Sequence, residues 1–523
     1  MRRSVLLALI IAGTACAPAP LAVIREADTT RPTPTVPDDL ELALPDVAAP
    51  ADSGTESGTG ESDTGQSNKG ETAVEDVQVD TPEPSGNRFM IDVDMAATFE
   101  LQGEREPRSY DRLLAAAAID VEQWLTADFV SPDGIRWDGL RGGRIAAGPG
   151  ADEIPGCGDG RFTSYQDLTL YVAFYCPIDD VIVLDDGPDG LLEYLGREHG
   201  DAAAAVVLAH EYAHALQERM DLLDGTVPTI LLEQQADCVA GAWLGRAVSG
   251  GSNVLQLDES DVRTSLIAIL NVRDPAGVDQ FEPNGHGSGF DRIGAFQVGF
   301  EEGLDTCLTL IDSPLDLMPN RFLSYDDYLR GGNAPYDCAF DPDPECRPSW
   351  EFLGEDLEEY WSLVIGEPIG LTSSPSPGSV SIDCPRATPV NDIVTLCPGS
   401  VAFDEAAVIP TYDEVGDFIL GYLLALGWVE EALTRVGSPA VGEDRALLSD
   451  CLIGAWVSDI TLGLDRDPAR TSTVGTSPGD LDEALEMIIR LSDPSTATDR
   501  SGTAFDKIAA FRTGVLGGLD ACV

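Results

Sequence analysis

The chain of 523 residues has few basic residues and few histidines. Its 31 Lys and Arg residues stand against 91 Asp and Glu residues, and the formal net charge is −60. This acidity excludes nonspecific nucleic-acid binding and makes an anionic membrane surface an unfavourable partner. We interpret the excess of acidic residues as a feature that keeps the protein in solution. No Gly-rich phosphate loop, dinucleotide fingerprint or serine elbow stands out, so nothing indicates a nucleotide-dependent enzyme or a serine hydrolase.

The apolar run at the start of the chain is too short to span a membrane as a helix. Two arginines, this run and small residues follow one another in MRRSVLLALIIAGTACAPAP (1–20), which predicts an export signal over residues 1–16. The segment Gly13 to Cys16 resembles a bacterial lipobox, in which Cys16 would carry the lipid, although a branched residue usually stands at the place of Gly13. Cleavage after Ala17 is the alternative. We therefore expect an extracytoplasmic protein, anchored through Cys16 or else secreted.

Residues 17–87 are rich in Pro, Thr, Ser, Gly and acidic residues, and few apolar residues recur in them. Such a segment cannot bury enough surface to offset the loss of chain entropy. It is typical of a disordered tether. From about residue 88 the composition is that of a globular protein.

The pentapeptide His210-Glu211-Tyr212-Ala213-His214 carries half of the four histidines in the chain. The run around it (201–220) is predicted to be helical, and residues four apart share one face of a helix. His210 and His214 can then bind one metal ion, with Glu211 placed to take a proton from a water that zinc activates. The alternative is an alanine-rich core helix with two incidental histidines.

A hydrolytic zinc site needs a third protein ligand and an open position for water. The next acidic helix, LLEQQADCVAGAW (231–243), offers Glu233 and, one turn later, Asp237. Glu233 is the candidate third ligand, and Asp237 is a candidate partner for the imidazole of a ligand histidine. Ordinary solvated helix charges are the alternative.

Four blocks of the sequence resemble the neutral zinc metallopeptidases of bacteria: FYCPIDDVIVLD (174–185), HEYAHALQ (210–217), EQQADCVAGAW (233–243) and HGSGFDRIGAFQVGFEEG (286–303). The resemblance covers roughly residues 88–307. It departs from the family at Ala213, where a glycine is common. It implies a compact zincin-like α+β domain over residues 88–310 and peptide-bond hydrolysis with Glu211 as general base. His286 is our candidate donor to the oxyanion, and a loop histidine with a structural hydrogen bond is the alternative.

The second half of the sequence repeats the first in degraded form. GSGFDRIGAFQVGFEEGLDTC (287–307) returns as GTAFDKIAAFRTGVLGGLDAC (502–522), and ADCVAGAW (236–243) returns as SDCLIGAW (449–456). DVEQWLTADF (120–129) matches DLEEYWSLVI (356–365) in the same way. We therefore expect a connector over residues 311–347 and a duplicated domain over residues 348–523.

The repeat lacks every candidate site residue except Asp237. Alignment of the two halves places Tyr422 opposite His210, Leu423 opposite Glu211, Leu426 opposite His214, Ala446 opposite Glu233 and Ser501 opposite His286. This pattern predicts a catalytically degenerate domain. Asp450 stands opposite Asp237, which indicates that Asp237 is also structural.

The chain has eleven cysteines, so lipidation of Cys16 would leave an even number. Cysteines at aligned positions can form the same disulfides in both halves, so we expect each cysteine to pair within its own half. This pairing predicts the disulfides Cys157–Cys176, Cys238–Cys307, Cys384–Cys397 and Cys451–Cys522, with Cys338–Cys346 in the connector.

Taken together, these patterns predict an exported zinc metallopeptidase with one Zn²⁺ per chain and a peptide or protein as its substrate. The ligand set His210, His214 and Glu233 does not by itself exclude manganese or iron. The alternative is an extracytoplasmic binding or scaffold protein with a structural or vestigial metal site. We expect no nucleic-acid partner, and contact with a membrane only through the N-terminal lipid.

Overall fold

The computed structural model describes residues 88–523 except 153, 156, 158–163, 170, 284, 323, 340–345, 378–381, 383, 465 and 493–501. The described residues belong to one compact unit. The expected export signal, Cys16 and the tether lie outside them. Within the described part, no helix combines the length and the apolar character that a bilayer span requires.

A four-stranded sheet forms one layer of the first region, by which we mean residues 88–310. Its strand order is β1-β2-β4-β3, with β1, β2 and β4 parallel and β3 antiparallel to β4. The strands are β1 (Glu100–Gln102), β2 (Gly143–Ala147), β3 (Ala173–Cys176) and β4 (Val181–Asp185). Strands β3 and β4 form a hairpin. Every residue of these two strands is buried, and alternate side chains enter two separate apolar clusters, because successive residues point to opposite faces.

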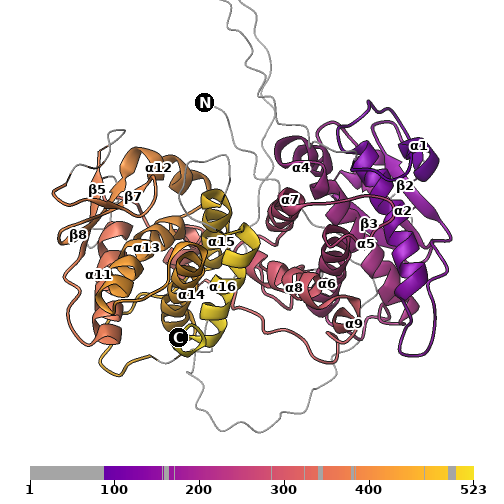
Figure 1. Cartoon of the computed structure of the whole chain (residues 1–523). Helices are drawn as coiled ribbons and strands as arrows, with labels where there is room; N and C mark the ends of the chain where they lie inside the picture. Colours follow the sequence, from indigo (N-terminus) through magenta and orange to yellow (C-terminus); the bar gives the residue numbers. More distant parts are fainter. Residues whose placement is uncertain are drawn as a thin grey trace, which may run out of the picture. The chain divides into compact units, whose positions relative to one another are not determined.

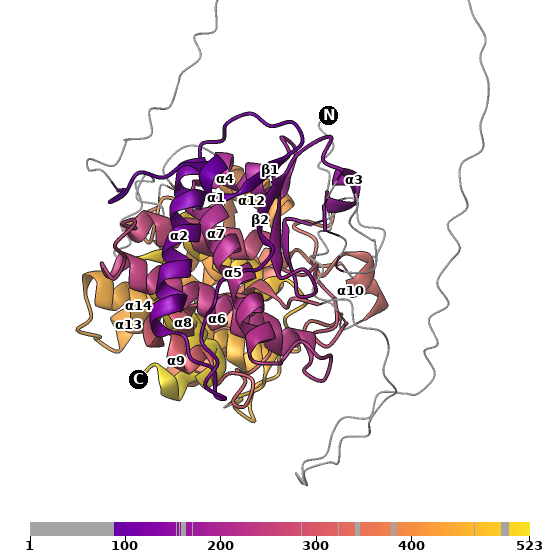
Figure 2. The ribbon, with the colours of Figure 1, turned by 90° about the vertical axis from the view of Figure 1, so that its right-hand side faces the viewer.

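Helices make up the rest of the first region: α1 (Met95–Thr98), α2 (Asp111–Asp128), α3 (Tyr165–Leu168), α4 (Leu191–His199), α5 (Ala202–Arg219), α6 (Thr229–Val248), α7 (Glu259–Asn271), α8 (Gly289–Glu302) and α9 (Leu304–Cys307). The central helix is α5, which contacts α2, α4, α6, α7 and β3 (Figure 2). Its run of alanines lets these neighbours approach, so residues 202–217 are all buried. The chain is α+β and rich in helix, as predicted.

Helices α6 and α8 are in close contact because each has a glycine at the crossing. A Cβ atom on Gly241 would overlap the carbonyl oxygen of Phe296, and one on Gly299 would overlap that of Cys238. The crossing fixes α6, which carries Glu233, against α8, which follows His286.

The second region, residues 348–523, has its elements in a similar order. After the connector helix α10 (Tyr325–Leu329) come α11 (Ser349–Ile365), β5 (Thr372–Ser376), β6 (Thr388–Pro389), β7 (Val394–Cys397), β8 (Ser400–Asp404), α12 (Glu405–Glu414), α13 (Phe418–Arg435), α14 (Gly442–Thr461), α15 (Asp480–Leu491), α16 (Ala504–Gly517) and the 3₁₀ helix η1 (Leu519–Ala521). Its sheet has the order β5-β8-β7-β6, with β5 parallel to β8 and β7–β8 a hairpin. The arrangement resembles β2-β4-β3 of the first region. Figure 1 labels β5, β7 and β8 in the second region and β2 and β3 in the first.

One buried contact occurs in both regions. The indole Nε1 of Trp243 donates to Asp120 Oδ2 at 2.9 Å, and that of Trp456 donates to Asp356 Oδ2 at 2.6 Å. These are the pairs that the alignment of the two halves places opposite each other. The contact supports a duplication, and the domain boundaries at residues 310 and 348 stay predictions.

The structure contains all five predicted disulfides, and none crosses between the regions. Cys238–Cys307 joins α6 to α9, and Cys451–Cys522 joins α14 to the end of the chain.

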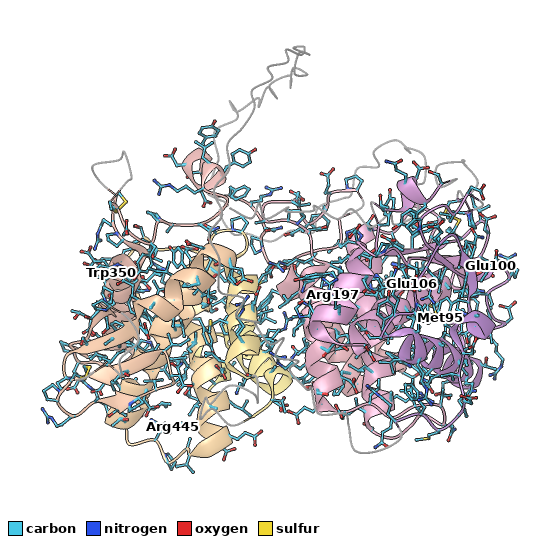
Figure 3. The ribbon with its side chains drawn as sticks, turned by 90° about the horizontal axis from the view of Figure 1, so that it is seen from above. Met95, Glu100, Glu106, Arg197, Trp350 and Arg445 are labelled. Atoms are coloured by element: carbon cyan, nitrogen blue, oxygen red, sulfur yellow. A yellow bond between two sulfur atoms is a disulfide. The ribbon has the colours of Figure 1, made fainter. Side chains whose placement is uncertain are left out.

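The two regions meet through α7 and α8 on one side and α15 and α16 on the other. Gln297 Nε2 donates to the carbonyl of Phe505 at 2.9 Å, and the Arg512 guanidinium donates to the carbonyl of Phe290. Gln297 and Arg512 are aligned positions, as are Phe290 and Phe505. The contact is therefore reciprocal, as at the interface of a symmetric dimer. Figure 3 shows side chains of both regions, including Met95 on α1 and Trp350 on α11.

Candidate metal centre

Three donor groups from two helices converge. His210 and His214 lie one turn apart on α5, with 3.1 Å between their Nε2 atoms. Glu233 on α6 places Oε2 3.1 Å from His210 Nε2 and Oε1 3.6 Å from His214 Nε2. All three side chains are almost completely buried. One donor atom from each can therefore contact a single metal ion, as the sequence predicts.

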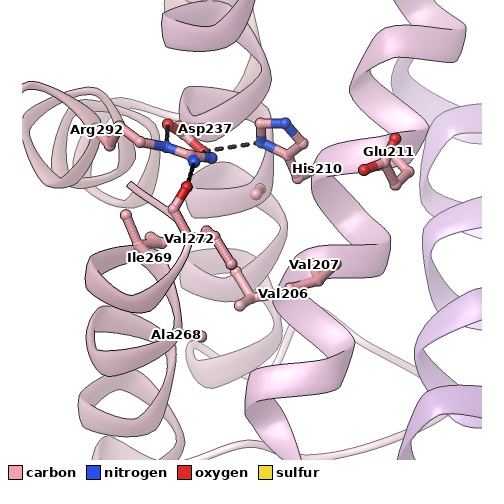
Figure 4. A pocket seen from close by; sticks show the side chains of 10 residues that line it. Val206, Val207, His210, Glu211, Asp237, Ala268, Ile269, Val272 and Arg292 are labelled. Atoms are coloured by element: carbon pink, nitrogen blue, oxygen red, sulfur yellow. Dashed lines mark hydrogen bonds and ion pairs between the residues drawn. The ribbon is translucent and has the colours of Figure 1, made fainter. Parts of the chain in front are cut away.

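The orientation of His210 is fixed by a second pair of side chains. Its Nδ1 lies 2.8 Å from Asp237 Oδ1, and Arg292 on α8 donates to both oxygens of Asp237 at 2.8 Å (Figure 4). Arg292 also donates to the carbonyl of Val272 at 2.5 Å. A carboxylate at Nδ1 favours the tautomer whose proton is on Nδ1, which leaves the lone pair of Nε2 for a metal. The expected role of Asp237 fits this geometry, whereas Arg292 was not predicted.

The orientation of His214 is fixed from within its own helix. Gln217, three residues later on α5, places Oε1 2.9 Å from His214 Nδ1 and donates from Nε2 to the carbonyl of Leu232 at 2.7 Å. Gln217 therefore connects α5 to α6 immediately before Glu233. Gln217 belongs to the block HEYAHALQ that carries the family resemblance, and its i+3 spacing from His214 is a signal for such a contact.

Glu211 follows His210 on α5 and is buried. Among the residues that the structure describes, its Oε2 atom has no hydrogen-bond partner. Burial raises the pKa of Glu211 above its ordinary value. The backbone amide of Tyr175 donates to the Glu211 carboxylate, so Oε2 is the oxygen that is left to accept a proton, and the raised pKa suits it to that role.

His286 lies in the loop between α7 and α8. Its Nδ1 is 3.2 Å from Asp274 Oδ1, and its backbone amide donates to Asp274 Oδ2 at 2.6 Å. Its Nε2 atom is buried and has no partner in the described part of the chain. The loop therefore holds His286 rigidly with one ring nitrogen left for another group. Asp274 was not predicted, and no motif in the sequence pointed to it.

The charges of the centre shift the pKa values of its acids and bases. Burial alone would raise the pKa of Glu233, but His214, His286 and His210 outweigh burial and lower it well below its ordinary value. Burial would lower the pKa of His210, but Asp237 and Glu233 raise it to about 10. In the metal-free protein, Glu233 is therefore ionised and the imidazole of His210 is protonated at neutral pH.

A small apolar cavity of about 20 Å³ lies beside His210 and Glu211. It is lined mainly by aliphatic side chains of α5 and α7, among them Val206, Val207 and Ile269 (Figure 4). It has room for about one water molecule. Asp237 and Arg292 also line this cavity, so its aliphatic walls lie next to the contact between His210 and Asp237.

The described residues of the second region that align with the candidate ligands do not include metal-binding side chains. The hydroxyl of Tyr422 donates to Asp450 Oδ1, where His210 contacts Asp237 in the first region. Leu423, Leu426 and Ala446 are buried apolar residues, and Ser501 is not among the described residues. The chain has no histidine after His286. The second region therefore cannot form a copy of this centre.

Comparison with known families supports the resemblance found in the sequence. Residues 166–309 match the model of a family described as "putative neutral zinc metallopeptidase". This match covers β3, β4, α5, α6 and α8, and hence every candidate residue of the centre.

Two relatives carry no assigned activity. The uncharacterised protein Rv2575 of Mycobacterium tuberculosis is 30% identical over 151 residues, which are 25% of this chain and 52% of that protein. The uncharacterised protein YpfJ of Escherichia coli is 27% identical over 171 residues, 28% of this chain and 54% of that protein. The chain thus spans about half the length of these relatives. No solved structure matches it.

Proposed function

We propose that the chain is an exported zinc-dependent peptidase that hydrolyses peptide bonds. The observation that carries this proposal is the convergence of His210, His214 and Glu233 next to Glu211, whose Oε2 atom has no partner among the described residues. Zinc, when bound, polarises a water and the substrate carbonyl. Two imidazoles and one carboxylate fit zinc and leave a position open, since the described residues supply no fourth donor to this group. An open position favours catalysis over a purely structural site.

Side chains of the protein transfer the proton, stabilise the developing negative charge and orient the ligands. Glu211 accepts the proton of the attacking water and passes it to the leaving amine. His286, whose Nδ1 lies against Asp274, donates from Nε2 to the oxygen of the carbonyl as negative charge develops there. Asp237 and Gln217 keep the two ligand imidazoles in the correct tautomer and orientation.

The proposal extends to the other parts of the chain. The second region is a duplicated, catalytically degenerate domain. Its aligned Asp–Trp contact, reciprocal interface and separate disulfides support this origin. Residues 1–16 direct export, and Cys16 carries a lipid anchor. Replacement of Cys16 by serine should release the protein from membranes, and a mature chain that begins at Pro18 without lipid would contradict the anchor.

The test is metal analysis combined with cleavage of a peptide library by the purified protein. We expect one zinc per chain, and a Glu211→Gln variant that keeps its zinc but loses activity by roughly 10²–10⁴-fold, because a base and not a ligand is removed. Glu218→Gln, on the same helix and outside the centre, is the matched control and should stay active.

Two results would contradict the assignment. Two zinc ions per chain would place a second site outside the first region. Full activity of Glu211→Gln would exclude Glu211 as the base. Stable zinc binding without cleavage of any peptide would instead favour the binding-protein alternative.

A further inference from the structure

A second group of converging donors lies in the second region, far along the chain from the zinc ligands. It consists of Asp417, which precedes α13, and of Asp480 and Glu483 in the first turn of α15. One carboxylate oxygen of each residue lies within 4.8 Å of those of the other two. Their exposed fractions are 7%, 4% and 5%, so all three carboxylates are removed from solvent.

Among the described residues, Arg273 acts through space on Glu483 and offsets only part of this charge. In the described part of the chain, none of the three carboxylates forms an ion pair, and the nearby Arg273 is paired with Asp482 at 3.1 Å. A further carboxylate, that of Asp327 on α10, acts on Asp417 and Asp480 as a like charge. Buried like charges at such spacing repel strongly unless protons or a cation neutralise them.

Backbone amides donate a hydrogen bond to one oxygen of each carboxylate. In the described part of the chain, the second oxygen of each of the two aspartates accepts no such bond. Three amides donate to the group: Ala334 N to Asp417 Oδ2 at 3.1 Å, Ser477 N to Asp480 Oδ2 at 2.8 Å, and Phe418 N to Glu483 Oε2 at 2.7 Å. Asp417 Oδ1 and Asp480 Oδ1 are buried and have no hydrogen-bond partner among the described residues. These amide contacts orient the carboxylates before any ligand binds.

The glycine before Asp417 leaves the space that the carboxylate of Glu483 occupies. Gly416 has φ +148°, and a Cβ atom at this position would overlap the carboxylate of Glu483. Any larger residue would therefore displace Glu483 from the group.

We propose that Asp417, Asp480 and Glu483 bind a hard divalent cation, Ca²⁺. Calcium takes oxygen ligands at 2.3–2.6 Å, so two oxygens bound to one ion can be about 5 Å apart, which all three donors satisfy. The group has no nitrogen or sulfur donor that would favour zinc. Asp417 Oδ1 and Asp480 Oδ1 gain the partner that they lack.

Proton binding is the competing way to neutralise the group. Burial raises the pKa of Asp417 to about 7 and raises the pKa values of Asp480 and Glu483 well above the ordinary range. Without a cation, these carboxyls would therefore hold protons near neutral pH. The experiment has to separate a bound cation from protonated carboxyls.

A bound ion would connect three segments. Ala334 belongs to the connector, Asp417 begins α13, and Asp480 and Glu483 begin α15. The same turn of α15 carries Asp482, which accepts from the amides of Gly289 and Phe290 at the start of α8. The cation would thus stabilise the part of the second region that contacts the first.

The experiment uses the full mature protein, freed of metal by a chelating resin and reloaded with one equivalent of zinc. Calcium chloride is the only probe, and the readouts are isothermal titration calorimetry and the thermal midpoint. We expect one Ca²⁺ per chain, bound more tightly than about 1 mM, the weak end for extracellular calcium modules, and a midpoint that rises with Ca²⁺. Magnesium chloride in a parallel titration should bind more weakly.

The double variant Asp480→Asn/Glu483→Gln should weaken Ca²⁺ binding at least 100-fold and abolish the rise in midpoint, while zinc stays bound. Glu486→Gln, on the same helix and outside the group, is the control and should bind Ca²⁺ like the parent. If the double variant does not fold, Asp417→Asn is read by the same titration. Absence of Ca²⁺ binding to the parent protein would overturn the proposal, as would undiminished binding to the variants. A thermal midpoint of the ion-free parent that falls as the pH rises toward about 7 and does not respond to Ca²⁺ would show that protons neutralise the carboxyls instead.

Discussion

Helices α5 and α13 occupy corresponding places in the element order of the two regions, but only α5 carries candidate metal ligands. In the first region, the aspartate on the following helix contacts His210. In the second region, the corresponding aspartate, Asp450, accepts a hydrogen bond from Tyr422. The contacts that both regions keep are those that hold helices together, namely the Asp–Trp pair, the glycines at the α6–α8 and α14–α16 crossings and a disulfide. The residues that differ are those that a metal requires, so the comparison separates structural from chemical roles.

The largest expected effect is at the aligned pair His210 and Tyr422. His210→Ala removes one of three ligands and should abolish zinc binding and activity. Tyr422→Phe removes the hydroxyl that donates to Asp450 and should lower the free energy of unfolding by about 1–3 kcal/mol, with zinc content and activity unchanged. Metal analysis, peptide cleavage and urea unfolding measure the three quantities. Loss of zinc in Tyr422→Phe would contradict a centre confined to the first region.

The disulfides Cys238–Cys307 and Cys451–Cys522 give a second matched pair. They close loops of similar length, with sequence separations of 69 and 71 residues. Replacement of either pair by serines should therefore cost a similar free energy of unfolding, about 4 kcal/mol for loops of this size.

Only the loss of Cys238–Cys307 should also weaken zinc retention, because this bond fixes the helix that carries Glu233. A competition titration with a zinc chelator measures the difference. Equal zinc affinities of the two variants would show that α6 is positioned without the disulfide.

Substitution of Asp237 and of Asp450 tests whether the aspartate found in both regions affects zinc binding only in the first region. Asp237→Asn should weaken zinc binding by about 10–100-fold, since the carboxylate that orients His210 is lost. It should also destabilise the fold by about 3–5 kcal/mol, because Arg292 is left as an unpaired buried charge. Asp450→Asn should destabilise the fold without any change in zinc affinity. A change in zinc affinity in Asp450→Asn would reveal communication between the regions.

The smallest expected effect concerns the helix caps that follow the two aligned loops. Ser288 Oγ accepts from Asp291 N at 3.1 Å at the start of α8, and Thr503 Oγ1 accepts from Asp506 N at 3.0 Å at the start of α16. Ser288→Ala and Thr503→Ala should each cost about 1 kcal/mol of stability. Only Ser288→Ala should lower kcat, since it loosens the segment next to His286. Equal kcat values in both variants would indicate that His286 is held by Asp274 alone.

Much of the fold was predictable from local patterns. Strands β3 and β4 are short continuous apolar runs, α2 has the apolar spacing of a helix, α5 and α6 carry the candidate ligand motifs, and the disulfides followed from the repeat of the cysteines. Strands β1 and β2 were not predicted. Strand β1 has only three residues, most of them exposed, and β2 begins at a glycine, so neither shows the alternation that identifies a strand.

The sequence by itself determined which side chains lie on one turn of one helix. His210 and His214 share a face because of their i, i+4 spacing, and Gln217 reaches His214 for the same reason. Only the tertiary structure decided which distant groups meet. Arg292 reaches Asp237 because glycines let α8 approach α6, and Asp417 meets Asp480 and Glu483 because α13 and α15 are in contact. Helical spacing is a property of neighbouring residues along the chain, whereas these contacts depend on how complete helices pack, which no local pattern specifies.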